Sequence, residues 1–209
     1  MLLKTLVKIS AVNNLSDARY CAGMGVAMMG FPLDSNHAHY VNPEQFKAIT
    51  QWIKGVALIG ELSSTNPVII HQTLERYALD YLQLIHPIKL QDITSVRVPT
   101  LLKIGLQGDE TITSLQTLMN AYTPYTKYFL LESVSSHEAA GAALQPTIDY
   151  LAHSFPILQG CQVSVATLPY LLGTKLQGVA LQIGMETKSG CKDFDQLAEV
   201  LALLSVEQP

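Results

Sequence analysis

Short runs of β-branched, aromatic and other apolar residues recur along the chain at nearly regular intervals, and a helix-like segment follows each run. The mean interval is 25 residues, with runs that begin near Leu3, Val26, Lys54, Leu79, Thr100, Lys127, Phe155 and Gly178. This interval is about the minimum for a strand, a crossover helix and two short loops, and eight such units close into a barrel. The sequence therefore predicts an α/β fold, a single (β/α)8 TIM barrel domain over residues 1–209.

An open, doubly wound sheet is the main alternative for strands that alternate with helices. Such sheets more often stop at about five or six strands, and no G-x-G-x-x-G turn follows the first expected strand. Helix starts favour the eightfold division, because Asn42-Pro43 and Asn66-Pro67 each place proline directly after an N-capping residue. Asp193–Gln196 has the pattern of a capping box before the last helix. The fourth helix, between Pro87 and Val98, is predicted to be short.

Charge and cysteine usage limit the partners and the compartment of the chain. Thirteen Lys and Arg against 17 Asp and Glu leave a net charge of −4, which repels a phosphate backbone and argues against nucleic acid as a partner. No apolar run approaches the roughly 20 residues of a membrane span. Cys21, Cys161 and Cys191 lack the spacing of a disulfide framework or a zinc site, and the histidines lack ligand spacing. We therefore expect a cytoplasmic protein with no membrane contact, no metal and no cofactor.

Reacting groups in such a barrel come from the carboxyl ends of the strands. Alternation along the first strand turns Lys8 and Ser10 into the interior. Further polar residues end the third, fourth, sixth and eighth strands, in order Glu61, Gln83, Glu132 and Gln182. A lone buried charge costs several kcal/mol. Lys8 is therefore predicted to pair with Glu132, either as a structural ion pair or as a catalytic pair.

Glycine-bearing turns follow the seventh and eighth expected strands, at Gln159–Cys161 and Gln182–Gly184. Barrels often bind phosphate at these places, on backbone N–H groups and the N-terminus of a short helix. Backbone geometry alone can also require glycine in a tight turn after a strand. The pattern leaves both interpretations open.

Four stretches carry a family signature: Val7–Ala18, Gly25–Gln45, Leu82–Leu84 and Gly178–Asp193. The first reads V-K-I-S-A-V-N-N-L-S-D-A, and the last closes with G-M-E-x-x-x-G-x-K-D. Together they resemble the phosphoribosylanthranilate isomerases of tryptophan biosynthesis, (β/α)8 barrels whose opening motif is V-K-I-C-G-I-T-N-x-x-D-A. The resemblance spans nearly the whole chain, so it also implies the barrel.

The resemblance implies an Amadori rearrangement, in which an acid protonates the ribose ring oxygen and a base removes the C2′ proton. Ser10 stands at the position of the family's cysteine base, and Glu132 at that of its aspartate acid. Both are expected catalytic residues, although a serine hydroxyl holds its proton far more tightly than a thiol. We therefore expect weak activity. The alternative is a non-catalytic paralogue that binds a phosphorylated ligand or a protein partner.

The same resemblance implies the binding residues and the partners. His39 stands where the family has an arginine that faces the anthranilate carboxylate, and Lys8 and Gln83 lie in family motifs, so these three are expected to bind substrate. The expected phosphate-binding residues are Gly160, Cys161, Gln182, Ile183 and Gly184. The resemblance also implies that the protein binds a small phosphorylated substrate and that it is a monomer or a homodimer. A further interpretation makes Lys8 an amine nucleophile, since burial can activate a lysine.

Overall fold

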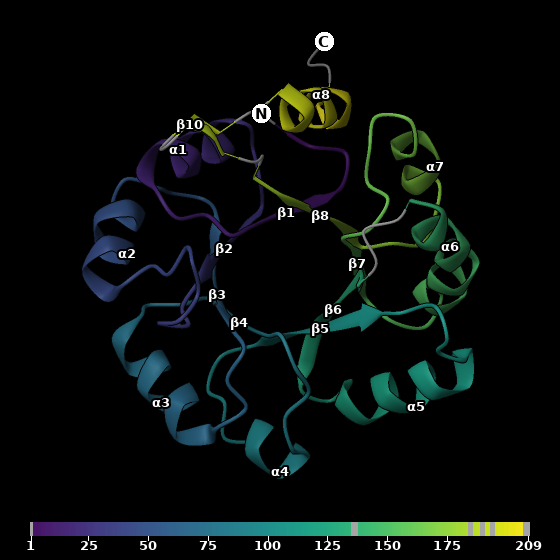
Figure 1. The fold of residues 1–209 in the computed structure, drawn as a ribbon, viewed down its shortest axis with the longest axis horizontal. Coiled ribbons are helices and arrows are strands. Elements are labelled where there is room, and N and C mark those ends of the chain that lie inside the picture. The colour runs from purple at the N-terminus through teal and green to yellow at the C-terminus, as the bar shows by residue number, and fades with distance from the viewer. Residues whose placement is uncertain (1, 135–137, 184–185, 189–190, 193–194, 207–209) are drawn as a thin grey trace.

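The computed structural model describes residues 2–134, 138–183, 186–188, 191–192 and 195–206. These residues form eight parallel strands that close into a barrel in chain order, with helices packed around the outside (Figure 1). The strands are β1 Leu6–Ser10, β2 Met28–Pro32, β3 Ala57–Leu62, β4 Tyr81–Leu84, β5 Thr100–Leu106, β6 Thr126–Ser133, β7 Ile157–Gln159 and β8 Gly178–Gln182. Parallel pairing of β1 with β8 closes the ring, which confirms the predicted (β/α)8 barrel and excludes the open sheet.

Helices surround the strands, and two of them begin at Pro43 and Pro67, where the sequence predicts. The helices are α1 Leu15–Gly23, α2 Pro43–Thr50, α3 Pro67–Arg76, α4 Leu90–Ile93, α5 Ile112–Tyr122, α6 Glu138–Ala152, α7 Leu168–Leu172 and α8 Asp195–Leu204. The side chains of Asn42 and Asn66 accept hydrogen bonds from the first turns of α2 and α3, and α4 is short as predicted. Strands β9 Glu186–Lys188 and β10 Cys191–Lys192 form a small antiparallel pair before α8. Asp193 of the expected capping box lies outside the described residues.

Two apolar layers follow from the alternation of side chains along the strands. Val7 and Ile9 are fully buried on the outer face of β1, against the helices. The inner face supplies a separate plug that fills the barrel: Met28, Ile59, Leu101, Leu130, Leu158 and Ala180. The predicted orientation of the first strand is therefore confirmed. No helix in the described part of the chain is long and apolar enough to cross a membrane.

Polar residues lie one inward position beyond the plug, toward the carboxyl ends of the strands. Glu61 follows Ile59 by two residues, and Glu132 follows Leu130 in the same way. Two strand residues correspond to about 7 Å along the strand. The plug thus forms the floor of a polar mouth, which is where barrel enzymes carry their sites.

Candidate active site

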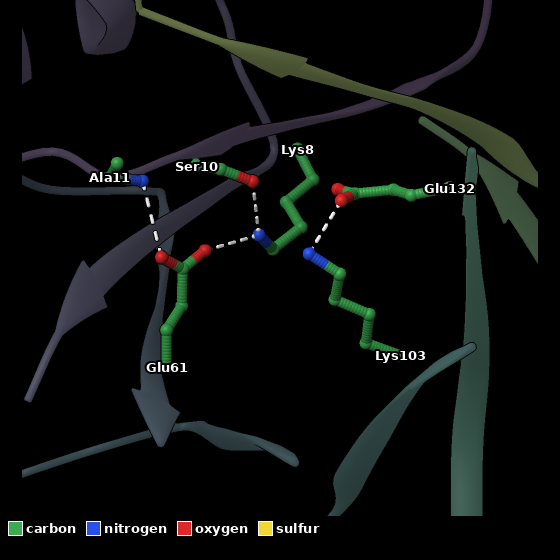
Figure 2. Close-up of polar contacts among 6 residues, drawn as sticks. All are labelled: Lys8, Ser10, Ala11, Glu61, Lys103 and Glu132. Carbon is green, nitrogen blue, oxygen red and sulfur yellow. Dashed lines mark hydrogen bonds and ion pairs between the residues drawn. The ribbon is translucent and has the colours of Figure 1, made fainter. Parts of the chain in front are cut away.

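Lys8 is the most deeply buried polar residue of the mouth, with a side chain that is 0% exposed. Its Nζ donates hydrogen bonds to Glu61 Oε1 at 2.6 Å and to Ser10 Oγ at 2.7 Å (Figure 2). The other oxygen of Glu61 accepts a hydrogen bond from the backbone N–H of Ala11 at 3.2 Å. Ala11 has a φ of 59°, so this bond also helps to hold a strained residue. We call Lys8 and Glu61 the sealed pair.

The predicted pairing of Lys8 with Glu132 is wrong. Glu132 Oε2 instead lies 2.6 Å from Lys103 Nζ, and we call these two residues the open pair (Figure 2). The physical reason is strand order: β5 and β6 are hydrogen-bonded neighbours, so an inward lysine on one lies beside an inward carboxylate on the other. Lys103 is the residue that sequence reasoning missed. Alternation from the inward Leu101 would have found it, because Lys103 follows by two positions.

The two ion pairs differ in exposure. The side chains of Lys8 and Glu61 are 0% and 8% exposed, whereas those of Lys103 and Glu132 are 29% and 16% exposed. Removing both charges of a pair from water is costly, so the sealed pair depends on its additional hydrogen bonds. The open pair is accessible to a ligand from the mouth.

Two glycines leave room for the two carboxylates. A Cβ on Gly30 would lie 2.1 Å from Glu61 Oε1, and a Cβ on Gly160 would lie 2.6 Å from Glu132 Cγ. Neither glycine is among those with positive φ. Gly160 is therefore required by the close approach of the Glu132 side chain, a reason different from both sequence interpretations of this turn.

We expect Gly160→Ala to lower the free energy of unfolding by about 1–3 kcal/mol, the usual cost of overpacking. The added methyl group would push Glu132 from its place beside Lys103. Urea denaturation measures the change. Gly23→Ala is the matched control, because a Cβ there meets no atom within 4 Å. In a Glu132→Ala background most of the cost should disappear, leaving only the contact with Leu130 Cδ1 at 3.2 Å, and an undiminished cost would contradict the contact with Glu132.

Gln83 carries a buried acceptor that faces the mouth. The residue is 3% exposed, and its Oε1 has no hydrogen-bond partner among the described residues. It lies beside Glu61 in the register of β3 and β4. A buried acceptor without a donor costs about 1–3 kcal/mol, so a ligand or water that donates to Oε1 would bind favourably. The role of Gln83 in substrate binding stays a prediction.

His39 and Cys161 differ in exposure, and their binding roles stay predictions. His39 is exposed, and its Nδ1 lies 3.1 Å from Asn13 Nδ2 in the loop after β1. Cys161 is buried, and burial raises the pKa of its thiol, with a further increase from the Glu132 carboxylate. A thiol with a raised pKa is a poor source of thiolate. Cys161 is therefore no substitute for a missing cysteine base.

A cleft of about 570 Å³ opens between the β7–α7 loop and α8. Its walls include Gly160, Ser164 and Gln162, together with Gln196 and Glu199 of α8. Gly160 thus lines a cleft large enough for a small ligand group. Of the other predicted phosphate-binding residues, Gln182 is exposed, Ile183 is half-buried, and Gly184 lies outside the described residues.

Comparison with known proteins gives a sequence relative and close structural neighbours, although no family model matches the chain. The N-(5′-phosphoribosyl)anthranilate isomerase of Maridesulfovibrio salexigens is 23% identical over 206 residues, which cover 97% of this chain and 99% of the relative. The crystal structure of phosphoribosyl anthranilate isomerase from Thermus thermophilus matches with a TM-score of 0.74 at 20% identity, covering 94% of this chain and 96% of that one.

A phosphoribosyl anthranilate isomerase in complex with reduced 1-(o-carboxyphenylamino)-1-deoxyribulose 5-phosphate also matches with a TM-score of 0.74, at 18% identity and over 94% of this chain and 96% of that one. At these identities the structural likeness shows the shared barrel. The sequence match extends along nearly the whole chain. Along nearly its whole length this chain is therefore similar in sequence to a phosphoribosylanthranilate isomerase, and it shares the (β/α)8 barrel of solved isomerases.

Proposed function

We propose that the protein is a phosphoribosylanthranilate isomerase-like barrel that binds a small phosphorylated sugar amine and rearranges it slowly. We expect a low rate because the Lys8 ammonium donates a hydrogen bond to Ser10 Oγ at 2.7 Å. This bond engages an oxygen lone pair that a base would need, and it places a positive charge beside it. The Glu61 carboxylate already accepts hydrogen bonds from Lys8 and Ala11, so it is poorly placed to activate Ser10.

The ion pair of Glu132 with Lys103 also does not suit the general acid that the family's reaction requires. A general acid must carry a proton that it can donate. Glu132 forms an ion pair with Lys103, the arrangement of a carboxylate that has released its proton. Loss of one proton-transfer group typically costs about 10²–10⁴ in rate. The rearrangement of phosphoribosylanthranilate should therefore be slow in the wild-type protein.

Turnover of phosphoribosylanthranilate by the purified protein tests this proposal. We expect a rate at least about 10²-fold below a typical enzyme kcat of about 10 s⁻¹. Chromatography of substrate and product over time measures the rate. A rate near the typical value would show that a base other than Ser10 operates in the wild-type site.

A non-catalytic paralogue remains the second candidate, because ligand-binding features persist where the proton-transfer groups differ. The cleft at Gly160 is open to a ligand, and Gln83 Oε1 is a buried acceptor with no hydrogen-bond partner among the described residues. A ligand that binds the folded state raises the melting temperature. A thermal shift with phosphoribosylanthranilate in the absence of turnover would favour this candidate.

We place the protein in the cytoplasm, as a monomer or homodimer. Cys161 is a free thiol in the described part of the chain, which suits a reducing compartment.

A further inference from the structure

We infer that Lys103 and Glu132 act together as a proton-transfer pair that enolises a carbonyl ligand in the barrel mouth. Glu132 would accept the proton from the carbon next to the carbonyl, and the Lys103 ammonium would stabilise the negative charge that develops on oxygen. The inference rests on the proposed function, because it requires a small sugar derivative to bind in the mouth. It assigns a role to Lys103 that no motif of the sequence indicates.

Access from the mouth distinguishes the open pair from the sealed pair. Lys103 Nζ and Glu132 Oε2 lie 2.6 Å apart on side chains that are 29% and 16% exposed. The inward position level with Glu132 on β5 is Gly105, and Gly160 lies against the Glu132 side chain from β7. The space at Gly160 is filled by the Glu132 side chain, and a Cβ on Gly105 would meet Val134 at 2.8 Å. A ligand therefore reaches the open pair through the exposed parts of the two side chains.

Hydrogen bonding excludes the sealed pair from the same role. Lys8 is fully buried and donates to Glu61 and Ser10, while both carboxylate oxygens of Glu61 accept hydrogen bonds. Lys8, Ser10 and Glu61 therefore form hydrogen bonds with one another. Full burial of Lys8 keeps a ligand from the sealed pair, whereas both side chains of the open pair are partly exposed.

The charges of the open pair are those that enolisation requires. An ionised carboxylate is the form that removes a proton, and Glu132 lies in an ion pair with Lys103. A cation placed where negative charge develops on oxygen lowers the barrier, most strongly where water is partly excluded. The pair thus combines a base with an oxyanion-stabilising group on adjacent strands.

The step balances without a further reactant. Glu132 takes the proton of the C–H bond, the bonding electrons form the C=C bond of an enolate, and the carbonyl π electrons move to the oxygen beside Lys103. Glu132 then returns the proton to carbon, and the electrons move back to restore the C=O bond. In D₂O the carboxylic acid exchanges its proton with solvent, so the carbon receives deuterium.

Deuterium exchange into a 1-arylamino-1-deoxyribulose 5-phosphate tests the inference, because its C1 protons lie next to the C2 carbonyl. The protein and this ligand are mixed in D₂O, and the C1 signal is followed by ¹H NMR. We expect exchange faster than in buffer alone, and a fall of about 10²-fold or more in the protein-dependent rate for Glu132→Gln and for Lys103→Met. Lys103→Arg keeps the charge and should retain part of the rate.

Lys127→Met and Glu75→Gln are the matched controls, since both remove an exposed charge outside the mouth and should leave exchange unchanged. Line broadening of the ligand in the same samples reports binding. Binding without protein-dependent exchange would overturn the inference and leave the proposed ligand class standing. Wild-type exchange in folded Lys103→Met would also overturn it. Absence of binding would overturn both proposals.

Discussion

Replacing Glu61 by glutamine should lower the free energy of unfolding by about 3–5 kcal/mol, the usual cost of breaking a buried ion pair. The substitution keeps the shape of the side chain and removes the charge opposite Lys8, whose side chain is 0% exposed. For a chain of 209 residues this corresponds to a melting temperature lower by roughly 6–20 °C, at about 2–4 °C per kcal/mol. Thermal and urea denaturation measure the effect.

Two further variants test whether the loss of stability comes from the buried charge of Lys8 or from a general sensitivity of the barrel to substitution. Lys8→Met combined with Glu61→Gln removes both charges, and it should recover much of the stability lost in the single variant. Glu75→Gln changes an exposed glutamate on α3 and should lie within about 0.5 kcal/mol of the wild type. If Glu61→Gln were as mild as Glu75→Gln, the Lys8 ammonium would have to be compensated by another group.

The fold could be predicted because its signals are local. The 25-residue interval and the proline-marked helix starts at Asn42 and Asn66 depend on neighbouring residues alone. Strand alternation likewise placed Lys8 and Ser10 in the interior, where the structure has them. These features depend on the spacing of apolar residues along the chain and on the residues that cap helices. Tertiary packing does not override them here.

The pairing inside the mouth could not be predicted in the same way. Alternation shows that Lys8, Glu61 and Glu132 point inward, but it does not show which of them meet across a closed barrel. That choice depends on register and on free space, such as the space that Gly30 leaves for the Glu61 carboxylate. Family resemblance directed attention to Glu132 and away from Lys103, which belongs to none of the quoted motifs. The open pair therefore emerges from the structure.

Ser10→Cys should raise the turnover of phosphoribosylanthranilate by about 10²–10⁴-fold, the contribution of a well-placed proton-transfer group. The Lys8 ammonium lies 2.7 Å from Ser10 Oγ, so a sulfur atom at this position would lie beside a positive charge. Such a neighbour lowers the pKa of a thiol below its usual value of about 8.5. The variant would thus hold a thiolate where the wild type holds a hydroxyl. A thiolate accepts a proton far more readily, and the family places its base at this position.

Two measurements on the same variant separate the acidity of the thiol from its catalytic use. The rate of alkylation by iodoacetamide as a function of pH gives the pKa of the new thiol, with the wild-type protein as the background for its own cysteines. Ser10→Ala is the matched control for turnover, because it removes the hydroxyl without adding a base, and it should not exceed the wild type. A low thiol pKa together with unchanged turnover would show that the missing base does not limit the rate. The limiting group would then be the acid, and Lys103→Met, which removes the ion-pair partner of Glu132, would be the substitution to test next.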